Sequence, residues 1–169
     1  MTTSGELFTR VMSIDAGQST GVAIIDYPNN GPMQVVHLDQ FVGSLSPTVE
    51  ELLWLNFSYQ PGVIAAERFD LRPGNKFLAD LTTVEVNGTL KYLWGDDNIV
   101  WQTPAQAKTL VNDMILKRLD LWVTGKQFGQ PDADDVRDAL RHNIRYAVQE
   151  LKHRPTIEEG WPKPAEEED

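Results

Sequence analysis

The order of strand and helix signals constrains the fold of this chain most strongly. Three strand-like segments come first, at residues 7–14, 22–25 and 33–41, with no helical pattern between them. Gly17 and Gly21 bracket the first turn, and a Pro-Asn-Asn-Gly-Pro cluster marks the second. Because strands joined by such short connections pair with each other, the sequence opens with a predicted antiparallel meander.

After the meander, helical and strand-like segments alternate. In chain order they are a helix over 46–60, a strand over 63–67, a helix over 75–94, a strand over 98–101, a helix from 103, and a final helix over 131–152. Strands separated by crossover helices lie parallel in one sheet. The sequence therefore predicts an α/β fold with a mixed five-stranded sheet, in which a three-stranded meander and two parallel strands are flanked by helices.

Two of these helices have a predicted buried stripe. In the helix over 75–94 the stripe is Phe77, Leu81, Val84, Gly88 and Tyr92. In the final helix it is Val136, Leu140, Ile144 or Asn143, Ala147 and Leu151. A capping box at Thr103-Pro104-Ala105-Gln106 begins the helix between them and places Lys108 one turn inside it. Residues 113–130 are mixed and contain a predicted loop with two glycines.

Composition predicts one domain followed by a tail. The 169 residues are 41% hydrophobic, which is enough for a single core. We expect this domain to cover residues 1–154. Residues 155–169 are rich in proline and glutamate, so we expect an acidic, disordered tail.

Several classes of protein are excluded by residue content. The chain has no cysteine, which excludes disulfides, thiolate metal sites and a cysteine nucleophile, and its three histidines make zinc a poor candidate. The apolar runs are too short for a membrane span, and residues 1–10 lack the features of a signal peptide. We therefore expect a soluble, cytoplasmic protein that does not contact membranes.

The charge distribution leaves nucleic acid open as a partner. The net charge of −10 argues against it at first sight. However, residues 1–67 carry −6 and residues 146–169 carry −4, whereas residues 68–145 are neutral with eleven basic side chains. Phosphate binding needs a local basic surface or metal ions held by acids, and the middle of the chain can supply either.

Four carboxylates are placed where they can converge. Asp15 ends the first strand and Glu67 ends the fourth, while Asp135 and Asp138 lie three residues apart on one face of the final helix. Converging carboxylates repel each other, and hard divalent cations such as Mg²⁺ remove that repulsion. Two such ions about 4 Å apart can activate water and stabilise a leaving oxygen in phosphodiester cleavage.

Each acid also has a plain structural interpretation. Asp15 can shape the turn before Gly17, and acids at a helix start interact favourably with its first turn. Asp132 and Asp134 compete with Asp135 for the place of the third acid. Glu67 and Asp138 are harder to explain in this way, because strands usually close with turn formers and Asp138 lies beyond the first turn.

Four segments together resemble RuvC-like Holliday-junction resolvases of the ribonuclease-H-like superfamily. They are Asp15 to Gly21 with the following Val-Ala-Ile-Ile-Asp, the run Val-Ile-Ala-Ala-Glu67, the segment Thr103 to Lys108, and Asp135-Val-Arg-Asp138-Ala-Leu. They span about residues 9–150 and occur in the family's order. The small size and the loops look most like bacteriophage versions.

This resemblance implies a ribonuclease-H-like fold and a homodimer that cuts branched DNA. It implies catalytic and metal-binding roles for Asp15, Glu67, Asp135 and Asp138, with Mg²⁺ as the cofactor and Mn²⁺ as a possible substitute. We expect the helix over 75–94 in the dimer interface, because its apolar residues point in several directions.

Basic and aromatic residues complete the predicted DNA surface. Lys108 is placed near the strand ends, and Arg141, His142 and Arg145 continue the helical face of Asp138. In the loop after Glu67, the predicted DNA contacts are Phe69, Arg72 and Lys76, and an aromatic side chain there can stack on bases.

Other functions stay open from the residues alone. A nuclease of the same fold acting on RNA or RNA–DNA hybrids would use the same acids. The segment Asp15 to Thr20 also resembles the phosphate loop of actin–hexokinase-type nucleotide-binding proteins, although these use two such domains. A non-catalytic interaction module would carry the acids as surface features.

Overall fold

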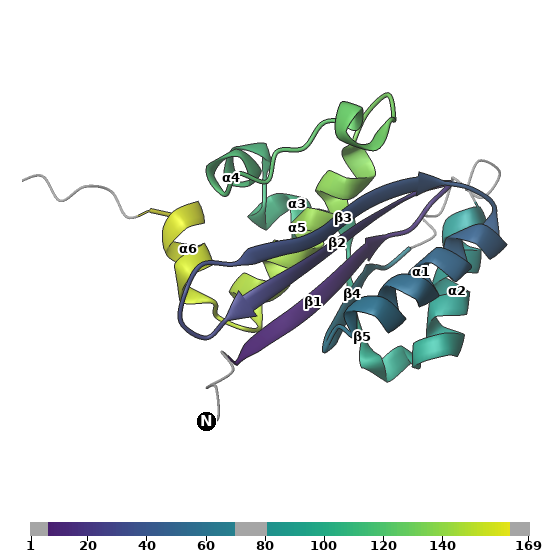
Figure 1. Cartoon of the computed structure of the whole chain (residues 1–169), viewed down its shortest axis with the longest axis horizontal. Helices are drawn as coiled ribbons and strands as arrows, with labels where there is room; N and C mark the ends of the chain where they lie inside the picture. The colour runs from purple at the N-terminus through teal and green to yellow at the C-terminus, as the bar shows by residue number, and fades with distance from the viewer. Residues whose placement is uncertain (1–6, 70–80, 163–169) are drawn as a thin grey trace, which may run out of the picture.

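One mixed sheet with helices on both faces forms the centre of the protein (Figure 1). The computed structural model describes residues 7–69 and 81–162. The strands are β1 (Phe8–Asp15), β2 (Ser19–Pro28), β3 (Gln34–Val42), β4 (Val63–Glu67) and β5 (Ile99–Gln102). The α-helices are α1 (Leu45–Tyr59), α2 (Leu81–Trp94), α3 (Pro104–Leu110), α4 (Asp113–Arg118), α5 (Asp134–Gln149) and α6 (Arg154–Gly160), with short 3-10 helices η1 (Asp96–Asn98) and η2 (Gly125–Phe128).

The sheet has the strand order β3-β2-β1-β4-β5. Strands β1, β2 and β3 pair antiparallel, whereas β4 is parallel to β1 and β5 is parallel to β4. The predicted fold class is thus confirmed, including the meander and the two parallel strands. As a result, the carboxyl ends of β1, β4 and β5 lie at the same end of the sheet.

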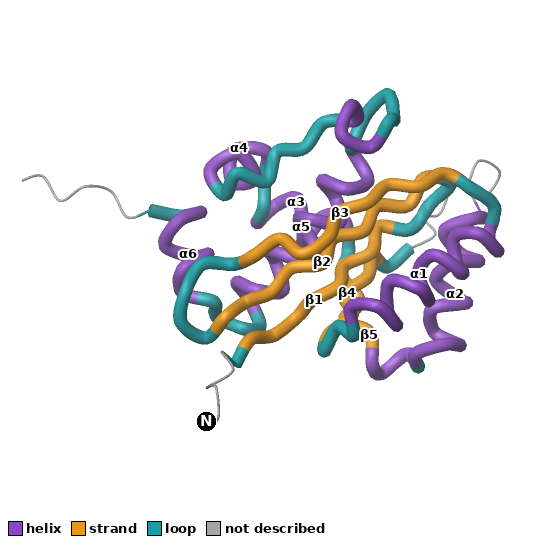
Figure 2. The backbone as a smooth tube through the Cα atoms, in the orientation of Figure 1, coloured by secondary structure: helices purple, strands orange, loops and turns teal. Residues whose placement is uncertain are grey.

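The two faces of the sheet bury separate cores. Successive residues of a strand point to opposite faces, so Val11 of β1 packs in one core and Met12 in the other. Helices α1 and α2 cover the Met12 face, and α5 with its neighbours covers the Val11 face (Figure 2). Helix α5 crosses the carboxyl ends of the central strands, where Asp15 and Glu67 lie.

Helix α5 is fixed to the sheet by its apolar face and by one buried amide. Four residues of the predicted stripe are fully buried: Val136, Leu140, Ile144 and Ala147. Beside them, the Nδ2 atom of Asn143 donates hydrogen bonds to Val11 O and Ala23 O, at 3.1 and 3.0 Å. The Tyr27 hydroxyl donates to Asn143 Oδ1 at 2.8 Å. These bonds fix the height of α5 on β1 and β2, because a buried amide without partners is costly.

The predicted stripe of the helix over 75–94 was wrong. Within α2 the sheet-facing residues include Val86 and Leu90, which are fully buried, whereas Val84 and Tyr92 are exposed. Apolar and β-branched residues occur all round this helix, so several stripes fit its sequence and the sheet face selects one. Phe77 and the rest of residues 75–80 lie outside the described residues.

Part of the segment predicted to be a disordered tail is folded. Helix α6 begins with His153, whose ring accepts from Thr156 N, and Pro155 lies in its first turn. A proline there favours a helix, because the first amides have no partner inside the helix. Gly160 packs against Ile115 and Leu119, so α6 belongs to the domain. The last seven residues, 163–169, lie outside the described residues.

Other boundaries differ by a few residues. Helix α1 begins at Leu45 with Ser44 as its N-cap, ahead of the predicted start at Ser46. Helix α5 begins at Asp134 rather than at Pro131, and α4 lies within the region predicted as mixed. No helix within residues 7–69 and 81–162 is long and apolar enough to cross a membrane.

Candidate active site

The first two acids end neighbouring strands. Ile14 of β1 is paired with Ala66 of β4 in a parallel register. The next residue on each strand is the acid, Asp15 on β1 and Glu67 on β4. The register therefore places both carboxylates at one end of the sheet.

Gly21 brings the helix acids to this end. It is the antiparallel partner of Asp15 on β2. A Cβ atom at position 21 would lie 2.1 Å from both the carbonyl carbon and the carbonyl oxygen of Asp135. The backbone of α5 therefore rests directly on the strand, which only glycine allows. This contact places Asp135 beside Asp15, so Gly21 serves close packing rather than the turn predicted for it.

A side chain from β3 holds the start of α5. The N-cap residue Ala133 has no side chain that can cap the helix. Gln40 replaces that cap, since its Oε1 accepts from Val136 N at 3.4 Å and its Nε2 donates to Asp132 O at 3.1 Å. The first turn of α5, which carries Asp135, is therefore tied to the sheet.

The electrostatics show that the acids act on one another. Burial raises the pKa of Asp15 well above its usual value, and the charges of Glu67, Asp138 and Asp135 raise it further, while Lys108 lowers it. Burial also raises the pKa of Asp135, against the Ser19 hydroxyl, which lowers it, and nearby acids add to the rise. A group of acids with this mutual repulsion is the kind of site that a divalent cation stabilises.

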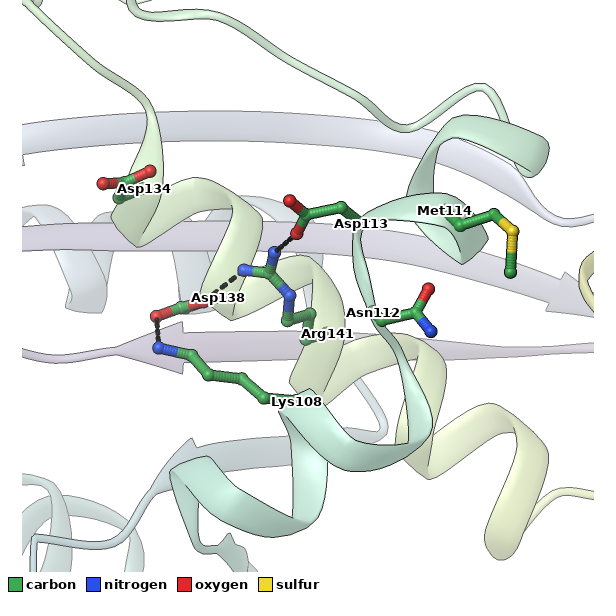
Figure 3. Close-up of a pocket in the computed structure, with 7 residues that line it drawn as sticks. All are labelled: Lys108, Asn112, Asp113, Met114, Asp134, Asp138 and Arg141. Carbon is green, nitrogen blue, oxygen red and sulfur yellow. Dashed lines mark hydrogen bonds and ion pairs between the residues drawn. The ribbon is translucent and has the colours of Figure 1, made fainter.

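Two cationic side chains hold Asp138. Lys108 Nζ lies 2.7 Å from its Oδ2, and Arg141 contacts its Oδ1 (Figure 3). The hydrogen bond with Asp138 raises the pKa of Lys108. Arg141 also binds Asp113 and donates to Val111 O at 3.1 Å. Both oxygens of Asp138 are thus engaged.

A cavity opens beside this ion-pair chain. Its volume is about 620 Å³, and seven residues line it: Lys108, Asn112, Asp113, Met114, Asp134, Asp138 and Arg141. Figure 3 shows Lys108 and Arg141 both directed at Asp138, with Asp134 a turn away. The exposed Lys108 ammonium lies at this cavity next to Asp138.

Glu67 is held by a buried histidine. His142 Nε2 lies 3.2 Å from Glu67 Oε2, and His142 Nδ1 lies 3.2 Å from Gln102 Oε1. The His142 side chain is only 1% exposed. The Glu67 side chain is therefore supported by a buried histidine, a contact that the sequence did not predict.

The residues fit a divalent cation in chemistry but are not closed around one. Within the described residues no group of three or more histidine, aspartate or glutamate side chains is close enough to hold a metal ion as it stands. The donor set is nevertheless four carboxylates, the ligands that Mg²⁺ prefers. Two of these acids also have protein partners, since Asp138 pairs with Lys108 and Arg141 and Glu67 contacts His142.

The competing third acids have other roles. Asp134 pairs with Arg137 on the exposed side of α5, and Asp132 Oδ1 accepts from Asp134 N at 3.2 Å. Asp135 is half-buried and raises the pKa of Asp15. Of the three, only the charge of Asp135 acts on Asp15.

The predicted DNA-binding residues on α5 need correction. His142 is buried and cannot contact DNA, and Arg141 is an internal partner of Asp138 with a side chain 10% exposed. Both residues are buried because α5 packs against the sheet on one side and against α3 on another. The single apolar stripe predicted for this helix accounted only for the sheet side. Arg145 is half-buried. Lys108 is exposed, at the edge of the cavity.

The residues after Glu67 are only partly described. Phe69 is half-buried and lines a second cavity of about 220 Å³, together with Lys91 of α2 and Trp101 of β5. This cavity is distinct from the one beside Asp138. Arg72 and Lys76, also predicted to bind DNA, lie outside the described residues.

None of the sequence patterns used for the prediction pointed to Gln102 or Asp113 as part of the site. Gln102 ends β5 in register with Glu67, so a polar residue closing an otherwise apolar strand was the available signal. Asp113 supports Arg141 from the start of α4 and carried no recognisable pattern.

No protein-family model matches the sequence, and no curated protein matches it. Solved structures do match the fold. RuvC of T. thermophilus in complex with a Holliday junction substrate is 13% identical, with 87% of this chain and 97% of that chain covered and a TM-score of 0.63.

Two further matches come from a eukaryote and a virus. The yeast mitochondrial Holliday junction resolvase is 16% identical over 88% of this chain and 82% of its own, with a TM-score of 0.59. The fowlpox virus Holliday junction resolvase is 14% identical over 82% of this chain and 97% of its own, with a TM-score of 0.53. The protein therefore has the ribonuclease-H-like fold of the RuvC-type Holliday junction resolvases.

Proposed function

We propose that the protein is a divalent-metal-dependent endonuclease that cuts branched DNA, with four-way junctions as its preferred substrate. One observation carries this proposal: the register of β1 and β4 and the packing of α5 on Gly21 gather Asp15, Glu67, Asp135 and Asp138 at one end of a sheet of this fold. The junction resolvases named above share that fold.

The four acids are the proposed ligands for Mg²⁺, or for Mn²⁺ in its place. When bound, such ions activate the attacking water and stabilise the leaving oxygen. Lys108 is exposed at the cavity edge, and its proposed role is to bind a substrate phosphate once it leaves Asp138. Arg141 stays with Asp113 and Val111, and so keeps a fixed positive charge next to Asp138.

We also propose a homodimer, because a four-way junction presents two equivalent strands to be cut and a two-fold dimer presents two equal sites. Val84 and Tyr92 on α2 are exposed apolar residues, and the neighbouring α1 exposes Trp54 and Phe57. Helices α1 and α2 pack together on one face of the sheet (Figure 1). This surface is the proposed interface.

The test is cleavage of matched nucleic acids under one set of conditions. A four-way junction, its linear duplex, single-stranded DNA, an RNA–DNA hybrid and RNA duplex are each incubated with the protein and Mg²⁺ or Mn²⁺, with EDTA as the control. Paired cuts in the junction, absent in EDTA, are expected. Preferential cleavage of the hybrid or RNA would instead indicate a ribonuclease of the same fold, and cleavage of no substrate would contradict the proposal.

A further inference from the structure

We infer that His142 and Gln102 are positioning residues that hold Glu67 in place as a metal ligand. The inference rests on the proposed function, since it concerns the same acids. It is argued from a separate observation: a chain of contacts runs from Gln102 of β5 through His142 of α5 to Glu67 of β4.

The geometry fixes the orientation of the imidazole ring. Gln102 Nε2 donates to the backbone oxygen of His142 at 3.1 Å, so Gln102 Oε1 is turned toward His142 Nδ1, at 3.2 Å. The other ring nitrogen, Nε2, lies 3.2 Å from Glu67 Oε2. Each ring nitrogen therefore faces a side-chain oxygen, and a hydrogen on Nε2 is directed at a single carboxylate oxygen of Glu67.

The elements that carry these residues explain the effect. Gln102 of β5 is paired with Glu67 of β4, and both end their strands. His142 lies one turn after Asp138 on α5. The contact therefore ties the strand ligand to the helix that carries Asp135 and Asp138, and sets the separation of the two halves of the site.

Burial makes this support rigid. His142 is 1% exposed, and Gln102 is also fully buried. Removing the partner of a buried polar group lowers the stability of the folded protein, because water cannot take the place of that partner. Hydrogen bonds behind a ligand fix its orientation, and removing them typically weakens metal binding 10- to 100-fold. One oxygen of Glu67 is held by His142, which leaves the other for the metal ion.

Two substitutions at position 142 separate positioning from packing. In His142→Gln the longer amide can place its NH₂ where Nε2 was and donate to Glu67. In His142→Asn the amide ends near the former Nδ1 and can reach only Gln102. Both variants remove the ring, and they differ in the contact with Glu67 and, by one methylene, in volume.

The readout is the dissociation constant for Mn²⁺, measured by calorimetry on the full chain without nucleic acid. We expect His142→Asn to weaken Mn²⁺ binding by about 10- to 100-fold and His142→Gln to recover most of that loss. Equal Mn²⁺ affinity in the wild type and both variants would overturn the inference. So would an equal loss in both variants, which is the result expected if a hydrogen bond to Glu67 has no effect on the metal ion.

His153 supplies a matched control. It is also a buried histidine with two partners, since its Nε2 lies 3.0 Å from Pro28 O and its Nδ1 lies 2.8 Å from Thr156 Oγ1. It supports α6 rather than the acids. His153→Asn should lower the Tm without changing the Mn²⁺ dissociation constant, and a comparable loss of Mn²⁺ affinity there would overturn the inference.

A second readout needs no metal. The chain has three histidines, so their ring nitrogen signals can be resolved in a ¹⁵N NMR spectrum. Glu67→Gln should shift the Nε2 signal of His142 in EDTA and leave that of His153 unchanged. An unchanged His142 signal would overturn the inference by showing that the contact is absent.

The outcomes for the site and for the function can be told apart. If the variants change Mn²⁺ affinity as expected but the wild type cuts no junction, the proposed function fails and the positioning role stands. If the wild type cuts junctions and all three forms bind Mn²⁺ equally, the positioning role fails and the proposed function stands.

Discussion

Replacing Gly21 with alanine tests whether the close approach of α5 to β2 builds the candidate site. The new Cβ atom would lie 2.1 Å from two backbone atoms of Asp135, whereas ordinary contacts begin near 3.4 Å. The helix start must therefore move by about 1.3 Å, because a backbone clash cannot be relieved by a rotamer change. Asp135 and Asp138 move with it.

A displacement of this size has two expected effects. Misplacing catalytic groups by about 1 Å can cost about 100-fold in rate, so Gly21→Ala should slow junction cleavage by about that factor. Overpacking also costs about 1–3 kcal/mol, which corresponds to a Tm lower by roughly 2–12 °C for a chain of this length. Single-turnover cleavage in Mg²⁺ and thermal unfolding in EDTA measure the two effects.

Gly62→Ala is the matched control. Gly62 also flanks the central strands, but a Cβ atom there would lie 3.9 Å from the nearest atom, Arg10 O. We expect its stability to change by less than about 0.5 kcal/mol and its cleavage rate to stay at the wild-type value. If Gly21→Ala cleaves junctions as fast as Gly62→Ala does, the site is not built by this contact.

Four further predictions follow from the described contacts. Asp138→Asn should abolish cleavage but retain junction binding in a gel-shift assay, and unchanged cleavage would contradict this. The same variant should lower the Tm in EDTA by roughly 2–8 °C, because the buried Arg141 loses a partner. Asp15→Asn should instead raise the Tm in EDTA at neutral pH. The pKa of Asp15 is raised in the folded state, so the charged carboxylate destabilises the fold once the pH rises above the pKa of the unfolded chain, about 3.9. The gain in Tm from Asp15→Asn should therefore vanish when unfolding is measured below that pH. Light scattering at micromolar concentration should give twice the chain mass of 19.1 kDa, and glutamate at Val84 and Tyr92 should reduce it to one chain; a monomeric wild type would refute the dimer. Truncation after Pro162 removes a net charge of −3 and should tighten duplex binding most at low salt, so equal binding across a salt series would leave these residues without a role in DNA binding.

The changes in Tm expected for Asp15→Asn and Asp138→Asn have opposite signs because, of these two acids, only Asp138 is ion-paired within the part of the chain that the structure describes. Repulsion between converging carboxylates, taken alone, would make the removal of an acid such as Asp138 stabilising in EDTA. In the structure that expectation applies to Asp15, whose pKa is raised by burial and by its acidic neighbours. It does not apply to Asp138, because Lys108 and Arg141 already neutralise it.

The sequence by itself determined the sheet and the positions of the acids. The antiparallel meander and the two parallel strands followed from local signals: short turns between the first three strands and helices between the later ones. Asp15 and Glu67 were identifiable because each directly follows a buried strand, and Asp135 and Asp138 because their spacing places them on one helix face. These are properties of neighbouring residues, which a single sequence records.

Only the tertiary structure decided what surrounds those acids. His142 and Glu67 are 75 residues apart, and Arg141 and Asp113 are 28 apart, so no local pattern connects them. A charged or polar residue on a helix is predicted to face solvent unless the partner that satisfies it is known. Burial of such a side chain is favourable only when it has hydrogen-bond partners inside the fold. These partners come from distant segments of the chain, so local sequence patterns do not identify them.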